Sequence, residues 1–157
     1  MTDHPEAQPP AHPAQAVLDT NAVLDLFVFR DPAAQALRRA LQAGALRWIV
    51  TPHLLEELRR VLAYPAVQAW APHGNDASAW MQARMSEALE LATLHAAEIR
   101  PCPVRCLDAD DQPFLDLAFT LACPLISKDK RVRQAARRAR MACVATGDEL
   151  LALRAAH

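Results

Sequence analysis

Four acidic side chains could act together on one substrate, because each follows a predicted strand or lies in the first turns of the helix after one. These residues are Asp19, Glu57, Asp111 and Asp129. Carboxylates that gather in one place repel one another unless a cation is present or their pKa values rise. Oxygen-only ligands favour Mg²⁺ or Mn²⁺ over zinc, and such ions activate water and stabilise charge on a phosphodiester in transit. The acids therefore predict metal-dependent hydrolysis of phosphodiester bonds.

Alternating strands and helices must position these acids. Apolar runs predict strands at residues 16–18, 46–50, 98–100, 124–126 and 141–144. Apolar residues at helical spacing predict helices between and after them, including residues 32–41, 77–97, 108–121, 130–140 and 148–154. Two helices begin at a capping residue followed by proline, Asp31-Pro32 and Thr51-Pro52. The pattern predicts a three-layer α/β/α domain with a central parallel sheet, and the carboxyl ends of its strands share one edge.

Asp19 is the strongest of these candidates. It directly ends an apolar strand and has no evident partner in the local sequence. Thr20 and Asn21 either orient this carboxylate or cap the helix that follows. Both are therefore predicted as supporting residues.

The other three acids each have a structural explanation as well. Glu57 adjoins Arg59 and Arg60 on a helix that could simply face solvent, and Asp129 could cap the helix that begins at Lys130. Asp111 shares its segment with Asp108, so either residue could be the ligand and the other a helix cap.

Basic residues follow Asp129 in an unusual density. Residues 128–140 contain seven Lys or Arg among thirteen residues, which could draw a phosphate backbone across the acidic site or form an ordinary solvated helix face. The residues predicted to contact nucleic acid are Lys128, Lys130, Arg131 and Arg133.

The overall composition sets the remaining bounds. Hydrophobic residues make up 52% of the 157, and the net charge of -1 provides no general attraction to nucleic acid or membrane. Neither a spanning apolar run nor a secretory signal is evident, which predicts a soluble, cytoplasmic protein. Residues 1–14 contain four prolines and are predicted to be a flexible tail, with a single domain over residues 15–157. The four cysteines read as reduced thiols.

Four stretches resemble the motifs of the PIN-domain family, specifically the bacterial group regarded as toxins of toxin-antitoxin pairs. The resemblance covers residues 16–152. The stretches are Val17-Leu18-Asp19-Thr20-Asn21, Leu55-Glu56-Glu57-Leu58-Arg59-Arg60-Val61-Leu62, Leu107-Asp108-Ala109-Asp110-Asp111-Gln112-Pro113-Phe114-Leu115 and Leu125-Ile126-Ser127-Lys128-Asp129-Lys130.

The resemblance implies a Mg²⁺ or Mn²⁺ site, cleavage of single-stranded RNA, homodimerisation and inhibition by an antitoxin. The residues that it assigns to catalysis are Asp19, Glu57, Asp111 and Asp129, of which Asp19, Asp111 and Asp129 are predicted metal ligands, with support from Asn21 and Ser127. One departure concerns Lys128, because the family commonly has glycine before the last acid. The lysine is expected to pair with Asp129 or with phosphate.

Two other functions fit parts of the pattern. An aspartate-based phosphotransfer domain also has an acid after its first strand, although the dehalogenase-type motif would need a second acid where Asn21 stands. Alternatively, the fold could serve as a non-catalytic module that binds RNA or a protein partner. Retention of all four acids argues against that module.

Overall fold

A parallel sheet confirms the predicted α/β/α architecture. Within residues 14–74 and 76–155, which the computed structural model describes, five parallel strands are ordered β3-β2-β1-β4-β5. Their bounds are β1 Ala14–Leu18, β2 Leu46–Val50, β3 Ala92–Leu94, β4 Leu125–Ile126 and β5 Cys143–Val144. The chain builds outward from β1 to β3 and then returns to the other side of β1 with β4. Open parallel sheets bind ligands where the strand order reverses in this way, which here is the carboxyl edge between β1 and β4.

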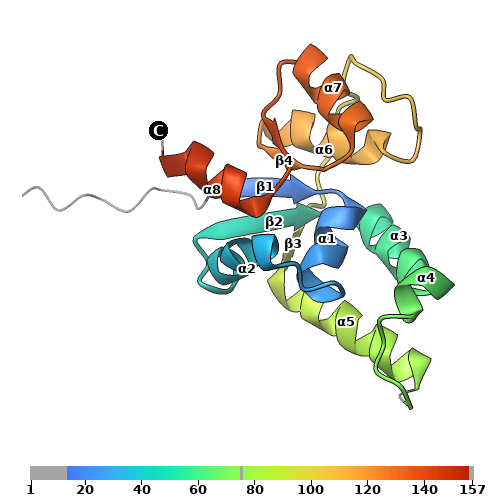
Figure 1. Ribbon diagram of the computed structural model, residues 1–157. Helices are drawn as coiled ribbons and strands as arrows, with labels where there is room; N and C mark the ends of the chain where they lie inside the picture. The colour runs from blue at the N-terminus through green and yellow to red at the C-terminus, as the bar shows by residue number, and fades with distance from the viewer. Residues whose placement is uncertain (1–13, 75, 156–157) are drawn as a thin grey trace, which may run out of the picture.

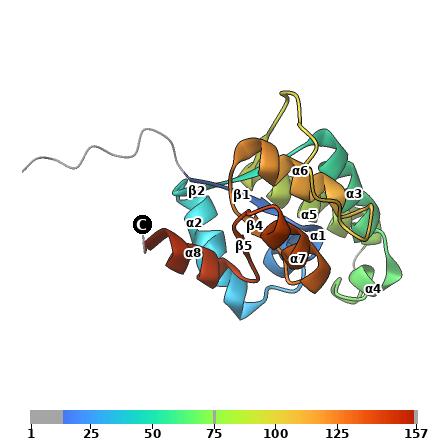
Figure 2. The same cartoon turned by 90° about the horizontal axis from the view of Figure 1, so that it is seen from above.

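Helices cover both faces of the sheet (Figure 1). Their bounds are α1 Thr20–Phe27, the 3₁₀ helix η1 Pro32–Ala34, α2 Gln35–Gln42, α3 Pro52–Leu62, α4 Pro65–Gln68, α5 Ala77–Leu91, α6 Gln112–Leu121, α7 Lys130–Arg138 and α8 Gly147–Ala155. In Figure 1, α6 and α7 lie on one side of the sheet and α1, α2 and α5 on the other. Figure 2 shows α8 beside α2, where Leu150 of α8 is fully buried.

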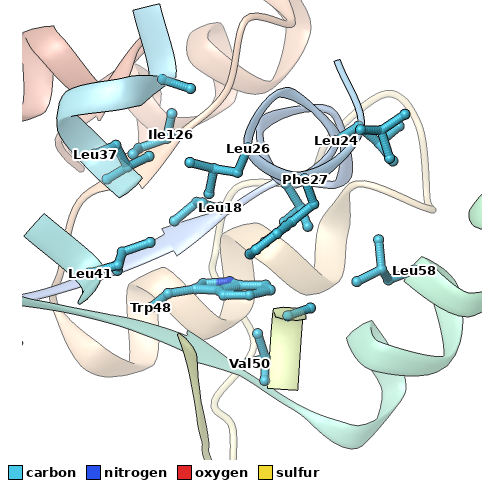
Figure 3. Packing of buried hydrophobic residues seen from close by; sticks show 14 of the residues in the cluster. Leu18, Leu24, Leu26, Phe27, Leu37, Leu41, Trp48, Val50, Leu58 and Ile126 are labelled. Carbon is cyan, nitrogen blue, oxygen red and sulfur yellow. The ribbon is translucent and has the colours of Figure 1, made fainter. Parts of the chain in front are cut away.

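Alternate strand residues divide the core into two layers, because successive side chains point to opposite faces of a sheet. In β1, Ala16 and Leu18 join the layer formed with α1, α2, α3 and α5, whereas Val17 joins the layer formed with α6 and α7. Figure 3 shows the first layer, in which Leu18 and Trp48 lie close to Phe27 of α1. The rings of Phe27 and Trp48 are 6.0 Å apart. Apolar contacts on both faces explain why the strands lack polar alternation.

The capping predictions at two helices are confirmed. The Asp31 carboxylate accepts a hydrogen bond from the Ala33 N–H at 3.0 Å, and the Thr51 hydroxyl accepts one from the Leu54 N–H at 3.2 Å. The first of these helices is divided, since Pro32 begins η1 and the α-helix follows from Gln35.

The helix predicted over residues 77–97 is confirmed from Ala77 to Leu91, but its predicted end and the predicted strand at 98–100 are wrong. Helix α5 ends at Leu91, and the next three residues form β3, in which Trp48, Ile49 and Val50 of β2 pair with residues 92–94. Pairing satisfies the hydrogen-bonding groups on that side of β2, which a longer helix would leave open. Residues 98–100 instead approach α6, where the Arg100 N–H donates to the Thr120 hydroxyl at 2.8 Å.

The start of α6 and the end of the predicted N-terminal tail are two further boundaries to compare with the structure. Helix α6 begins at Gln112 rather than Asp108, because residues 108–111 form a turn in which the Asp108 carboxylate accepts from the Asp110 N–H at 2.9 Å. The predicted tail lies outside the described residues except for Ala14, which begins β1. No helix among the described residues combines the length and apolar character needed to cross a bilayer.

Candidate active site

Asp19 and Asp129 lie at the carboxyl ends of the two strands that flank the switch in strand order. Strands β1 and β4 pair in parallel, and the Asp19 N–H donates to the Ile126 carbonyl at 3.0 Å. Asp19 is also the N-cap of α1, where its carboxylate accepts from the Ala22 N–H at 2.9 Å. The Asp129 carboxylate caps α7 in the same way, accepting from the Arg131 N–H at 2.8 Å. Asp19 and Asp129 therefore each cap a helix, and both lie at the same edge of the sheet.

These bonds correct two expectations about the first motif. Asp19 has a partner in the local sequence after all, and the cap of α1 is Asp19 itself rather than Thr20 or Asn21. Thr20 and Asn21 instead line the cleft beside it. Capping preferences alone could not single out Asp19, because aspartate, threonine and asparagine are all good N-caps.

Ser127 joins the two acids. Its side chain is fully buried, its hydroxyl donates to the Asp19 carboxylate, and its oxygen accepts from the Asp129 N–H at 3.1 Å. A buried hydroxyl that donates and accepts in this way fixes both neighbours. Ser127 thus links Asp19 and Asp129 at this edge of the sheet.

Glu57 and Asp111 complete the group from the other elements. Glu57 lies on α3 and Asp111 is the N-cap of α6, where its side chain makes no capping hydrogen bond. One cleft is lined by all of the predicted acids, namely Asp19, Glu57, Asp108, Asp111 and Asp129, together with Asp110. The neighbouring Glu56 differs, since it pairs with Arg59 at 3.6 Å outside the cleft.

The acids in this cleft perturb one another. Burial, followed by the charges of Asp108, Asp129, Asp19 and Glu57, raises the pKa of Asp111 to about 6. Burial also raises the pKa of Asp19, against the lowering effect of the bonds from Ser127 and Ala22. Perturbed carboxylates that share a cleft are characteristic of functional sites.

Glu57 is affected by both acids and bases. Burial raises the pKa of Glu57, the nearby Asp110 adds to that effect, and Arg60 and His53 oppose it. His53 is exposed on α3, so it acts on Glu57 through its charge rather than as a buried neighbour. The cleft as a whole carries an excess of acid over base.

The donor set fits a hard divalent ion. Every titratable side chain that lines the cleft is a carboxylate apart from Tyr64, and carboxylate oxygens are the ligands that Mg²⁺ and Mn²⁺ prefer. Among the described residues, no three Asp, Glu, His or Cys side chains stand close enough together to form a ready coordination group.

Lys128 does not pair with Asp129 as expected. Its ammonium nitrogen lies 2.8 Å from a carboxylate oxygen of Asp25 and 3.1 Å from one of Asp31. The hydrogen bonds with Asp25 and Asp31 raise the pKa of Lys128. We name Asp25, Asp31 and Lys128 the lysine cluster. Sequence reasoning missed it because Lys128 and Asp31 are 97 residues apart and no local pattern connects them.

The other predicted nucleic-acid contacts differ in exposure. Lys130 and Arg131 are exposed in the first turn of α7, and Arg133 is half-buried. The backbone of Arg131 also supplies the capping N–H for Asp129. Of the four predicted contacts, Lys130 and Arg131 are therefore the two with exposed side chains that make no ion pair within the described residues.

Aromatic side chains at the cleft were not predicted as functional. Phe29 and Tyr64 line it, and Phe114 lies beside Asp111 in its wall. The dipeptide Tyr64-Pro65 does predict an extended conformation at Tyr64, because the residue before a proline is restricted to that conformation. The end of a helix explains this pattern as well as a functional role does. Only the fold shows that this turn borders the acids.

Comparison with known families gives one match. A family model of the PIN domain matches residues 15–131, from β1 to the first turn of α7. The matched region contains all four acids. No curated protein sequence matches the chain.

Proposed function

The chain belongs to the PIN-domain family, whose fold is generally that of a nuclease, and we propose that this member is a Mg²⁺- or Mn²⁺-dependent endoribonuclease that cuts single-stranded RNA. The observation that carries the proposal is that Asp19, Glu57, Asp111 and Asp129, which come from separate elements, line one cleft. In agreement with that geometry, the charges of neighbouring acids act with burial to raise the pKa of Asp111. A protein gains nothing in stability from such repulsion, which supports a role in binding a cation.

Each acid has a proposed role. Asp19, Asp111 and Asp129 would hold the ion, while Ser127 fixes the first and last of them through its hydroxyl. When bound, Mg²⁺ or Mn²⁺ would supply activation of a water molecule and stabilisation of negative charge on the phosphoryl oxygens. Glu57, whose pKa is raised by burial, accepts a proton from the attacking water at a carboxylate oxygen. The water oxygen bonds to phosphorus, the bond from phosphorus to one ribose oxygen breaks, and that oxygen takes up a proton from solvent, to which Glu57 later returns the proton that it accepted.

The test is cleavage of a labelled single-stranded RNA by the purified protein with Mg²⁺, Mn²⁺ or EDTA. We expect cleavage only with a divalent ion, and we expect Asp19→Asn to abolish it. Glu57→Gln should lower the rate by about a hundredfold, as loss of a general base does. Glu56→Gln is the matched control and should leave the rate unchanged, because Glu56 pairs with Arg59 outside the cleft.

Two results would reject this function. Cleavage that persists in EDTA and in Asp19→Asn would remove the metal-dependent mechanism. Tight binding of RNA without cleavage under any of these ions would favour the non-catalytic binding module.

The biological role extends the same proposal. We take the protein to be the toxin of a toxin-antitoxin pair, a cytoplasmic homodimer that a cognate antitoxin inhibits. Support comes from the resemblance of the four motifs to the bacterial toxin group of this family. Expression of the chain alone should arrest growth of a bacterial host, and co-expression of the protein encoded by the adjacent gene should restore it. Normal growth with the active protein would reject the toxin role.

A further inference from the structure

Three aromatic side chains form a ledge at one rim of the acidic cleft. Phe29 and Tyr64 line the cleft. Trp70 contacts Phe29, with the ring centres 5.0 Å apart and the planes inclined by 60°. We name Phe29, Tyr64 and Trp70 the aromatic ledge.

Two residues of the aromatic ledge, Tyr64 and Trp70, are exposed rather than packed in the hydrophobic core. Tyr64 is 55% exposed and Trp70 is 57% exposed, whereas Trp48 and Trp80 are only 2% and 7% exposed. Aromatic side chains of this size usually contribute to stability by being buried. Their exposure beside the acids suggests a surface for another molecule.

The backbone holds the ledge in place. The Tyr64 N–H donates to the Val61 carbonyl at 3.0 Å, and Pro65 follows as the first residue of α4. The Trp70 N–H donates to the Val67 carbonyl at 3.1 Å, and the side chain of Val67 is buried in the core. The backbone of Tyr64 and of Trp70 is thus fixed at the two ends of α4, which Val67 anchors to the core.

A basic residue next to the ledge indicates what that ligand is. Arg60 is exposed and precedes Tyr64 by one helical turn, and its charge lowers the pKa of Glu57 in the cleft. The rim therefore combines a cation for phosphate, flat rings and a cluster of acids suited to a metal ion. Proteins that bind single-stranded nucleic acid combine a basic groove with aromatic rings on which bases stack. A protein partner would use the exposed rings but has no need of the adjoining acids.

We propose that Tyr64 and Trp70 stack on an unpaired base of the RNA next to the phosphate held at the acids. This inference rests on the proposed ribonuclease function and adds the reason for single-strand selectivity. A base within a duplex has its faces covered by its neighbours and is not free to stack on a protein ring.

Binding is measured first, with a short single-stranded RNA and the Asp111→Asn variant in Mg²⁺ so that the RNA stays intact. Trp70 is the exposed tryptophan among the three, so stacking should quench the protein's fluorescence. Trp70→Ala and Tyr64→Ala should each weaken binding by about tenfold, within the usual range for loss of one stacking contact. Trp70→Phe should retain most of the affinity. Leu89→Ala removes a side chain of similar exposure on α5, outside the cleft, and should have no effect.

Three outcomes would overturn the ledge. These are unchanged affinity in both alanine variants, equal quenching by the same RNA annealed to its complement, and a change of oligomeric state in place of a change in RNA affinity. The last, measured by light scattering, would assign these rings to a protein interface.

A second measurement separates failure of the ledge from failure of the proposed function. With the acids intact, Trp70→Ala should raise KM for single-stranded RNA about tenfold and leave kcat unchanged, since it removes binding rather than chemistry. Normal RNA cleavage by the parent and the variant alike would reject only the ledge. Absence of metal-dependent cleavage in the parent would reject the proposed function itself.

Discussion

Two groups of carboxylates at the same edge of the sheet have opposite electrostatic surroundings. Burial raises the pKa values of Asp19, Glu57 and Asp111 in the cleft, whereas in the lysine cluster the Ala33 N–H and Lys128 lower the pKa of Asp31. The two groups are near enough that Asp25 contributes to the raised pKa of Asp19. Lys128 lies between Ser127 and Asp129 in the sequence, yet its ammonium group forms ion pairs with Asp25 and Asp31.

The difference shows which group needs a cation from outside. The lysine cluster contains its own positive charge and can form in the folded chain alone. The cleft contains several carboxylates without an equivalent ammonium group, so a divalent ion would relieve their repulsion. Lys128 also restrains the loop that carries Asp129 by linking it to Asp25 in α1.

The largest effect on activity is expected from replacing Asp111, the acid whose pKa is raised by the charges of four other acids. Asp111→Asn should lower RNA cleavage by at least about a hundredfold, since it removes a ligand of the proposed ion. Stability should be unchanged or slightly higher, because Asp111 makes no capping bond to α6 and its carboxylate is repelled by its neighbours. Activity assays and thermal denaturation check this pair of results. A collapsed thermal transition would instead assign Asp111 a structural role in starting the helix.

A divalent ion should stabilise the protein, and more so at higher pH. At about one hundred times its Kd, a ligand adds about 2.7 kcal/mol, which corresponds to a rise in Tm of roughly 5–10 °C for a domain of this size. The increase should shrink as the pH falls below about 6, where Asp111 takes up a proton and no longer attracts the ion. Thermal scans with Mg²⁺ or Mn²⁺ at pH 7 and pH 5 measure it. An equal rise in Tm at pH 7 and pH 5 would show that the ion does not bind at these acids.

Without an ion, the cleft should make stability fall as pH rises. The folded pKa of Asp111, about 6, exceeds the ordinary value of 3.8, so between these limits the folded state binds more protons than the unfolded state. The resulting loss is on the order of 1 kcal/mol after allowance for solvent screening of a half-exposed group. Denaturant titrations in EDTA at pH 4.5 and 7 should show it, and Asp111→Asn should lack it. The same slope in the variant would contradict the assignment.

Breaking the lysine cluster should have a moderate effect on activity. Lys128→Met leaves Asp25 and Asp31 without their cation and frees the loop before Asp129, so we expect cleavage to fall roughly tenfold through misplacement of that acid. The Ala33 N–H and, after it, Lys128 lower the pKa of Asp31, so the variant should also lose part of the stability that Asp31 contributes at pH values above its ordinary pKa of 3.8. Full activity in Lys128→Met would show that Asp129 is positioned without this contact.

The smallest expected effect is on the salt dependence of RNA binding, which should differ between Lys128, which is in ion pairs, and the exposed Lys130. Lys130→Met removes an exposed charge beside the cleft, so it should reduce the salt dependence of RNA binding by about one phosphate contact. Lys128→Met should leave that salt dependence unchanged, because its charge is already paired. Binding titrations at several salt concentrations make the comparison. A greater loss for Lys128 than for Lys130 would mean that RNA displaces the lysine from Asp25 and Asp31.

The predicted fold came closest to the structure where the signals are local. The strand at residues 46–50 has the bounds of β2, and the proline starts after Asp31 and Thr51 follow from capping chemistry within three residues. The boundary at Leu91 was missed because Ala92 and Leu94 continue the apolar pattern of α5. Pairing with β2 decided that boundary, and no property of the segment itself specifies a pairing partner.

The candidate site divides in the same way. The types and relative positions of Asp19, Glu57, Asp111 and Asp129 were sufficient to predict that they share one edge of a parallel sheet, since the strand-to-helix pattern fixes which ends coincide. The contacts of Ser127, Lys128 and Trp70 depended on the tertiary structure, because their partners lie on other elements far along the chain. Short-range capping and periodicity are encoded in neighbouring residues. Which side chains meet across elements is decided by packing of the whole core, because packing alone sets the distances between helices.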